Sequence, residues 1–259
     1  MARKLSDIKA RIESSRFEFY DYLMQTEDEV VMNSILELSK STRVFIFSGV
    51  IRNFFLGEKN NRDIDIILEK EIDIFSIFKH SEINRNSFGG YKIFLKKTVI
   101  DLWYLENTWA FKNGHIPVLS FHLDKMIPDT AFFNFSSIVY SLNDKTFYPT
   151  DDFARFLLEE QIDMVLEKNP NYKLCVVNTF YYSDKYKLEI KDRLKHYVVK
   201  LYQSHNKDYE AVQMKHFGKI IFTNKQIEHR IETIFLARKK FKKRKIVYKW
   251  FANNLGDDY

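Results

Sequence analysis

The segment from residue 44 to residue 68 constrains the fold most, because two short apolar runs enclose a Ser-Gly turn and a pair of aspartates. Val44-Phe45-Ile46-Phe47 precedes Ser48-Gly49, and Ile66-Ile67-Leu68 follows Arg62-Asp63-Ile64-Asp65. Short apolar runs bounded by turn residues are typical of buried strands. The spacing therefore predicts a strand, a tight turn, a short helix, a polar loop and a second strand.

Two chemical features of this segment point to phosphate chemistry. Asp63 and Asp65 lie two residues apart on the second predicted strand, so they share one face of the sheet. Ser48 and Gly49 open the predicted helix, whose free N–H groups can bind phosphate. Two carboxylates beside a phosphate cradle are what a divalent-metal phosphoryl-transfer site needs. The alternative is a buried turn followed by a solvated, aspartate-rich strand start.

The same residues resemble the head domain of the bacterial poly(A) polymerase and CCA-adding tRNA nucleotidyltransferase family, within the nucleotidyltransferase superfamily. That family carries Gly-Gly-x-Val-Arg-Asp, a Leu-Leu-Gly helix end and then Asp-x-Asp. The matching order and spacing are kept by Gly49, Arg52, Leu56, Gly57, Asp63 and Asp65. Ser48 stands where the family usually has its first glycine, and Asn53 where it usually has aspartate. The chain is thus similar to a divergent member of the family.

Composition bounds the class of protein. The chain has 259 residues, of which 45% are hydrophobic and 16% aromatic, enough to fill a core. It contains no apolar run of about 18 residues and its first residues lack an apolar signal core, so we expect neither a membrane span nor export. The single cysteine, Cys175, cannot form an internal disulfide and is expected to be a small buried hydrophobe. These features favour the cytoplasm.

The hydrophobic periodicity divides the chain into three parts. Residues 1–42 read as a helical segment. The strand-like pattern of residues 43–150 corresponds, by the resemblance, to the nucleotidyltransferase head domain. After Pro149 the period changes from two to 3.6, which predicts a helical neck domain with a basic tail over residues 151–259. The expected fold class is α+β, a mixed sheet with flanking helices followed by an all-helical C-terminal domain.

Within the head, two hairpins are expected. Tyr91–Leu95 and Thr98–Tyr104 read as strands joined by Lys96-Lys97, and Ser136–Tyr140 and Lys145–Tyr148 as a second pair. In the neck, Asp151 or Asp152 is expected to cap a helix that continues through Ile162 and Val165 and ends at Asn169-Pro170. Further helices are expected at about 173–185, 190–204 and 224–244.

A third carboxylate is expected at Asp101, which lies inside the apolar run Val99-Ile100-Asp101-Leu102-Trp103. A lone acid in a buried strand needs a partner or a metal. In the family the third acid follows a Phe-Gly-Thr segment and a short hairpin, and here Phe88-Gly89-Gly90 precedes the hairpin. The resemblance implies that Asp63, Asp65 and Asp101 are catalytic and hold two Mg²⁺. The alternative is that Asp101 caps a strand edge and bonds to backbone.

The resemblance also implies a nucleotide-binding set. It comprises Ser48, Gly49 and Arg52 in the head, with Arg52 facing phosphate or Asp63, and Lys173 and Asn178 in the neck. An ordinary structural role for Arg52 is the alternative. The Arg-Arg-Asp that normally precedes the family's Phe-Thr-Ile-Asn segment is replaced here by Asp129-Thr130-Ala131-Phe132, and no Glu-Asp-x-x-Arg base-reading motif is present. The resemblance therefore supports a metal site more than specific CCA synthesis.

The net charge of +6 is concentrated at the C-terminus, because residues 225–259 hold ten Lys or Arg and four Asp or Glu. Basic residues neutralise phosphates and nearby aromatic side chains stack on single-stranded bases. The proposed nucleic-acid contacts are Arg238, Lys239, Lys240, Lys242, Lys243, Arg244 and Lys245. A solvated basic helix face is the alternative.

These features together predict a metal-dependent nucleotidyltransferase that moves a nucleoside monophosphate from an NTP to a hydroxyl and releases pyrophosphate. ATP and CTP are the first candidate nucleotides, and the 3′ end of an RNA is the first candidate acceptor. Two alternatives stay open. One is a nucleotide- or RNA-binding module of the same fold without turnover, which the missing arginines favour. The other is a nucleotidyltransferase that modifies a protein.

Overall fold

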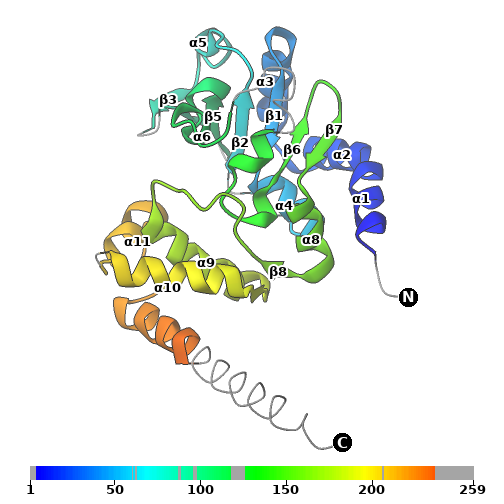
Figure 1. Ribbon diagram of the computed structural model, residues 1–259. Helices are drawn as coiled ribbons and strands as arrows, with labels where there is room; N and C mark the ends of the chain where they lie inside the picture. The colour runs from blue at the N-terminus through cyan, green and yellow to red at the C-terminus, as the bar shows by residue number, and fades with distance from the viewer. Residues whose placement is uncertain are drawn as a thin grey trace, which may run out of the picture. The chain divides into compact units, whose positions relative to one another are not determined.

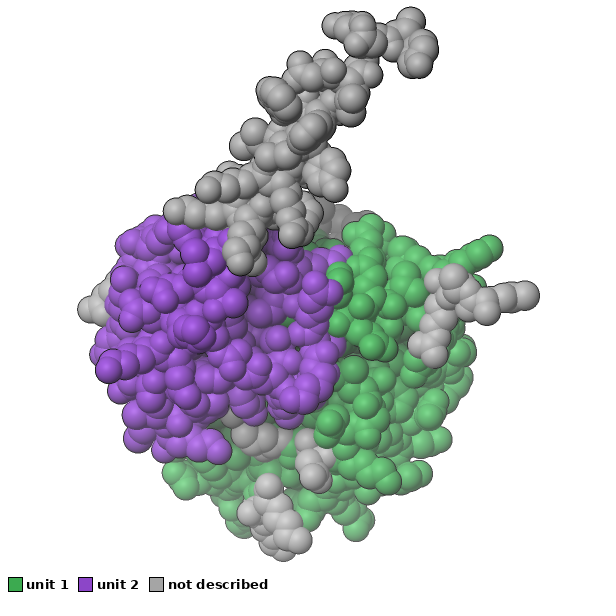
Figure 2. Space-filling view, turned by 90° about the horizontal axis from the view of Figure 1, so that it is seen from below, with its two compact units in different colours: residues 1–168 green, residues 169–259 purple. Residues whose placement is uncertain are grey.

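The computed structural model describes residues 4–59, 61, 63–86, 89–95, 98–117, 126–205 and 207–236. The chain forms two compact units, residues 1–168 and 169–259, which Figure 2 colours separately. The first unit holds the N-terminal helices and the sheet together with helix α8 (Asp151–Glu159). The domain boundary at residue 150 stays a prediction.

Three helices form the part of the first unit that was predicted to be a helical segment. They are α1 (Leu5–Ser14), α2 (Arg16–Thr26) and α3 (Glu29–Ser41), drawn in blue in Figure 1. Their buried side chains repeat at helical spacing, as with Ile8 and Ile12 in α1 and Phe19 and Leu23 in α2. The Asp28 carboxylate caps α3 by accepting from the Val30 N–H at 2.9 Å. The helices thus bury one side each.

The described residues form a seven-stranded mixed sheet in the order β3-β4-β5-β2-β1-β6-β7. Strands β2 and β5 run parallel, and the other neighbours run antiparallel. The strands are β1 (Val44–Phe47), β2 (Asp63–Leu68), β3 (Glu82–Arg85), β4 (Tyr91–Leu95), β5 (Thr98–Tyr104), β6 (Ile138–Ser141) and β7 (Thr146–Pro149). Both predicted hairpins and the predicted strands of residues 44–68 are confirmed, as is the α+β fold class.

Short helices connect the strands. They are α4 (Gly49–Leu56), α5 (Ile74–Ile77), α6 (Trp109–Lys112) and the 3₁₀ turns η1 (Leu105–Asn107), η2 (Ile127–Thr130) and η3 (Asn134–Ser136). The predicted helix after the Ser-Gly turn is therefore present as α4. It ends at Gly57, whose positive φ of 75° suits glycine.

The two faces of the sheet have different neighbours. On one face Tyr140 and Phe147 pack against Phe19 of α2, with ring centroids 4.9 and 5.1 Å apart. The other face carries Phe45 and Ile67, which belong to an apolar cluster completed by Leu105, Phe111, Met126, Ile127 and Val139. Asp63 and Asp65 alternate with the buried Ile64 and Ile66, so they share the face of Ile67.

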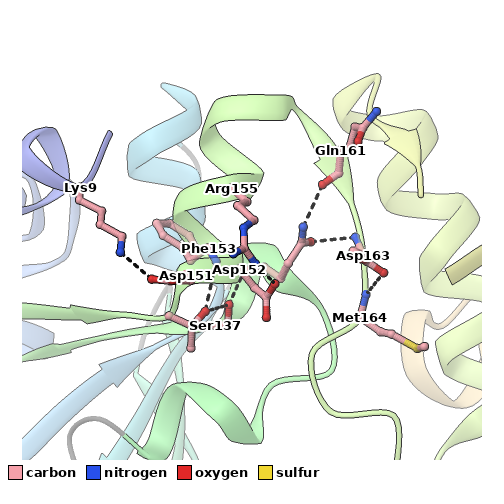
Figure 3. A network of polar contacts seen from close by, with 11 residues as sticks. Lys9, Ser137, Asp151, Asp152, Phe153, Arg155, Gln161, Asp163 and Met164 are labelled. Carbon is pink, nitrogen blue, oxygen red and sulfur yellow. Dashed lines mark hydrogen bonds and ion pairs between the residues drawn. The ribbon is translucent and has the colours of Figure 1, made fainter. Parts of the chain in front are cut away.

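The first neck helix is shorter than predicted. The Thr150 hydroxyl, not Asp151 or Asp152, caps α8 by accepting from the Phe153 N–H at 3.1 Å, and α8 ends at Glu159. The following residues are extended as β8 (Gln161–Ile162). Asn134 holds them there, because its side chain donates to the Gln161 carbonyl at 2.9 Å and accepts from the Asp163 N–H at 3.0 Å. Figure 3 labels the two partners, Gln161 and Asp163, and draws these bonds as dashed lines. These hydrogen bonds hold the chain from Gln161 to Asp163 in an extended conformation, so α8 does not continue through it.

In the second unit, α9 (Tyr172–Tyr186) and α10 (Asp192–Ser204) confirm two predicted helices, and residues 224–236 are helical. The short strand β9 (Glu189–Ile190) and helix α11 (Glu210–Phe217) were not predicted. The buried Gln213 side chain joins α11 to the next segment, because it accepts from the Phe222 N–H and donates to the Phe222 carbonyl, both at 2.8 Å. Residues 237–259 lie outside the described structure.

Two further observations concern Cys175 and the character of the helices. Cys175 is buried in α9, and burial raises the pKa of its thiol, as expected of a small buried hydrophobe. In the described part of the chain, none of the helices has both the length and the apolar character that crossing a membrane requires.

Candidate active site on the sheet

The turn between β1 and α4 adopts an unusual backbone conformation. Ser48 has φ 64° and ψ −110°, a region that L-residues rarely adopt and that favours glycine. Its Oγ donates to Ser136 Oγ at 3.1 Å. The serine thus keeps the backbone geometry of a glycine at the position where the resembled family usually has one.

Gly49 follows as the first residue of α4, and its φ is not in the left-handed region. A Cβ built there would have one neighbour within 4 Å, Arg52 Nη2 at 3.8 Å, which is ordinary van der Waals contact. The packing around Gly49 therefore does not require glycine. Only a group that approaches from outside the described structure would be crowded by a side chain here.

The predicted carboxylates lie on adjacent strands. Asp65 of β2 is the register partner of Asp101 on the parallel strand β5, and of Phe47 on β1. Register partners project from the same face of a sheet. Asp63 lies two residues before Asp65 and so shares this face. Since Ser48 follows Phe47 directly, the turn and the two β2 aspartates lie at the same end of the sheet.

Lys92 completes this row of side chains. It is the register partner of Asp101 across the β4–β5 hairpin, and its Nζ lies 2.8 Å from Asp101 Oδ1 and 2.9 Å from Oδ2. Asp101 is 12% exposed and Lys92 39%. The sequence reasoning expected a metal or a partner for Asp101 and did not identify Lys92. We use the name carboxylate row for four side chains that share one face of β4, β5 and β2, namely Lys92, Asp101, Asp65 and Asp63.

The row has the oxygen ligands that Mg²⁺ prefers, since Asp63, Asp65 and Asp101 present carboxylates on one face of the sheet. Within the ranges that the structure describes, however, no three His, Cys, Asp or Glu side chains are gathered closely enough to hold a metal ion. The Asp101 carboxylate is engaged by Lys92 instead. The donor chemistry therefore fits a divalent cation, while the third ligand is held in an ion pair.

Arg52 belongs to a buried hydrogen-bond network behind the turn. Asn53 Oδ1 accepts from Arg52 Nε at 3.2 Å and Nη2 at 3.0 Å, so the neutral amide does supply an acceptor. Asn53 Nδ2 donates to Asn61 Oδ1 at 3.0 Å, and Asn61 Nδ2 donates to Glu27 Oε1 at 2.9 Å. The prediction that Arg52 faces phosphate or Asp63 did not anticipate these bonds.

The network ties helix α2 to the start of β2. Asn61 Nδ2 also donates to the Tyr22 hydroxyl at 3.2 Å, and that hydroxyl donates to the Glu58 carbonyl at 3.1 Å. Burial raises the pKa of Glu27, and the Asn61 hydrogen bond acts in the opposite direction. Asn61, two residues before the aspartate-bearing strand β2, is thus fixed by the N-terminal helical segment.

The remaining predicted site residues lie in the second unit or outside the described residues. Lys173 and Asn178 lie in α9, and the Asn178 Oδ1 is buried and has no hydrogen-bond partner among the described residues. Their roles in nucleotide binding stay predictions. The whole basic stretch from Arg238 to Lys245 lies outside the described residues.

The likeness to known proteins lies in the fold. The chain matches no protein-family model and no curated protein sequence. Among solved structures, it is similar to a CCA-adding enzyme in complex with ATP, with a TM-score of 0.61 and 15% identity over 83% of this chain and 54% of that one. The same enzyme type with CTP gives a TM-score of 0.61 and 15% identity, covering 84% and 54%.

The Thermotoga maritima CCA-adding enzyme complexed with tRNA gives a TM-score of 0.58 at 14% identity, covering 83% of this chain and 53% of that one. At this identity the likeness establishes the fold, the head and neck of CCA-adding enzymes. The chain spans about half the length of these solved structures.

Proposed function

We propose that this chain is a metal-dependent nucleotidyltransferase that moves a nucleoside monophosphate from an NTP to a hydroxyl acceptor. One observation carries the proposal. In the fold of CCA-adding enzymes, Asp63, Asp65 and Asp101 share one face at the sheet end where the Ser48-Gly49 turn opens α4. Same-face carboxylates beside a phosphate-binding turn are the parts that this chemistry needs.

The chain's own residues would act in three ways. The free N–H groups at the start of α4 would bind the triphosphate, which can approach because Gly49 has no side chain. Asp63 and Asp65 would hold Mg²⁺, and two ions are proposed. The ions would neutralise negative charge on the triphosphate. Asn53, through its hydrogen bond to Asn61, would keep α4 behind the turn in place.

The reaction balances as a substitution at phosphorus. The acceptor oxygen forms a bond to the α-phosphorus while the bond from that phosphorus to the β-bridging oxygen breaks. Pyrophosphate leaves with that electron pair. The acceptor's hydroxyl proton passes to a carboxylate of the row, for which Asp101 is the proposed base. No other oxidant, reductant or co-substrate is needed.

The nucleotide and acceptor are the finer part of the proposal. The solved CCA-adding enzymes contain ATP, CTP or tRNA in their complexes, which makes ATP and CTP the first nucleotides to test and RNA the first acceptor. A protein acceptor is the second choice. The proposed place of action is the cytoplasm. Lys173 and Asn178 are proposed to contribute to nucleotide binding, and Arg238–Lys245 to RNA binding.

A second candidate function is a nucleotide-binding module without turnover. One observation favours it: Lys92 already engages Asp101, so the third carboxylate is not available as a ligand in this structure. Such a module would bind NTP with Mg²⁺ but transfer no label.

The deciding experiment incubates the protein with Mg²⁺, each α-labelled NTP, and either total RNA or total protein. We expect label in RNA, and its loss in Asp63→Asn and Asp65→Asn variants that keep the wild-type circular dichroism spectrum. Equal transfer by the double Asn variant would locate the chemistry elsewhere. Nucleotide binding without transfer to either acceptor would favour the second candidate. Label in protein alone would change the acceptor and keep the reaction.

A further inference from the structure

We propose that Lys92 is a built-in cation of the carboxylate row, which competes with divalent metal for Asp101 and thereby sets the metal affinity of the site. The inference deepens the proposed function and rests on it. Lys92 acts through Asp101, so it is a positioning residue and not a catalytic one.

The pairing follows from the backbone and not from a chance side-chain rotamer. The β4–β5 hairpin pairs Leu95 with Thr98, with the two residues 96–97 between them. This register fixes Lys92 opposite Asp101. Directly opposed residues on one face have Cβ atoms about 4.5–5.5 Å apart, so a lysine here reaches the carboxylate without displacing the backbone.

The energetics favour an ion pair in the absence of metal. Asp101 is only 12% exposed, and a shielded carboxylate without a partner is costly. Lys92 Nζ contacts both of its oxygens, at 2.8 and 2.9 Å. Lys92 itself is 39% exposed, so the amine can leave the carboxylate and become hydrated. The pair is therefore strong enough to hold Asp101 and exposed enough to exchange.

The neighbours of Asp101 make the competition specific. On its other side in the row lies Asp65, the register partner on β2, with Asp63 on the same face. A cation that binds Asp65 and Asp101 together must take the place of the lysine amine at Asp101. Use of Asp101 as a metal ligand would therefore come at the expense of the Lys92 contact.

The test measures Mn²⁺ binding alone, without nucleotide or turnover, by the electron paramagnetic resonance signal of free Mn²⁺. We expect Lys92→Met to raise the Mn²⁺ affinity by about tenfold. In this variant, metal binding no longer requires breaking the charge-assisted hydrogen bond between Lys92 and Asp101. Lys92→Arg, which keeps the charge, should leave the affinity near the wild-type value. Lys92→Gln serves as a second neutral variant should Lys92→Met fold poorly.

A general loss of positive charge would also strengthen cation binding, so two controls separate the explanations. Lys9→Met removes the same charge from an ion pair with Asp151, 2.7 Å long and half-exposed, outside the row. We expect it to change the Mn²⁺ affinity little. In an Asp101→Asn background, Lys92→Met should give no gain, because the contested ligand is absent. The double-mutant cycle isolates this coupling.

Each outcome decides between the proposals. A gain that persists in the Asp101→Asn background, or no gain at all in Lys92→Met and Lys92→Gln, overturns the inference while wild-type Mn²⁺ binding still supports the metal site. Absence of Mn²⁺ binding that depends on Asp63 and Asp65 in every variant would refute the metal site of the proposed function itself.

Discussion

Ser48 and Gly49 are adjacent in the turn, and the structure predicts that their stability responses to glycine and alanine are opposite. Ser48 has a backbone conformation that favours glycine, whereas Gly49 does not. At Ser48, glycine should therefore give a more stable protein than alanine. At Gly49, alanine should be at least as stable as the native glycine.

The magnitude at Ser48 follows from two opposing contributions. A non-glycine residue at such backbone angles carries about 1–3 kcal/mol of strain. Glycine loses about 0.5–1 kcal/mol more conformational free energy on folding than alanine does. Both Ser48→Gly and Ser48→Ala lose the Oγ bond to Ser136, so that loss cancels in the comparison. We expect Ser48→Gly to exceed Ser48→Ala in free energy of unfolding by about 1 kcal/mol.

At Gly49 the added methyl group would meet only Arg52 Nη2, at 3.8 Å. Replacing a glycine whose conformation alanine can adopt stabilises a protein by about 0.4–1 kcal/mol. Gly49→Ala should accordingly raise the free energy of unfolding by a few tenths of a kcal/mol or more.

Urea unfolding followed by circular dichroism measures all three variants against the wild type. The midpoints should shift at equal m-values, which identifies a change in stability. If Ser48→Ala proved more stable than Ser48→Gly, the positive-φ backbone conformation of Ser48 would be refuted. If Gly49→Ala lost more than about 1 kcal/mol, packing and not ligand approach would explain the glycine.

Three further predictions concern ligands and pH. Gly49→Val should weaken NTP binding, measured by calorimetry, far more than Ser48→Ala does, because a side chain there crowds the triphosphate; equal, small losses would give the turn a structural role only. Burial raises the pKa of Glu27, so its contribution to stability falls as pH rises above about 4.5, and Glu27→Gln should gain stability relative to wild type between pH 4 and pH 7 in urea titrations. A gain that shrank with rising pH would contradict that assignment. RNA affinity should fall steeply with salt, with a log–log slope of about −0.7 per neutralised phosphate. Alanine variants of the basic tail should flatten this slope and leave the NTP affinity unchanged. Negligible RNA affinity at low salt would refute the RNA acceptor. The residues to replace are Lys239, Lys240, Lys242 and Lys243.

Local pattern was sufficient for the strands that carry the site. The alternating apolar residues of Tyr91–Leu95 and Thr98–Tyr104, separated by two lysines, gave the bounds that the structure has. The same two-residue connection also fixes Lys92 opposite Asp101, so the ion pair was within reach of the sequence once the register was written out. What the sequence could not supply was the distance between the two charged groups.

Tertiary contacts decided where the neck helix ends. The apolar residues Ile162 and Val165 continue a helical spacing after Glu159, and neither glycine nor proline interrupts them before Pro170. The chain nevertheless leaves the helix at Glu160, whose φ is 54°. The competing bonds come from Asn134, which lies far away in the sequence. A local reading of residues 151–170 has no access to that partner.

Asn53 shows how a departure from a family pattern is absorbed by the surrounding residues. By sequence alone, replacing the usual aspartate by asparagine removes a charge beside Arg52. In the structure the amide does more than a carboxylate could, since its oxygen accepts from the guanidinium while its Nδ2 donates to Asn61 Oδ1. An ionised carboxylate has no proton to donate. The Asn61 Nδ2 already donates to Tyr22 and Glu27, so only its Oδ1 faces position 53. Aspartate at position 53 would place a carboxylate oxygen against that Oδ1, with no hydrogen between the two acceptors. Asn53 and Asn61 therefore depend on each other for their hydrogen bonds. Tyr22 and Glu27, which accept from Asn61, lie in the N-terminal helical segment outside the resembled motif.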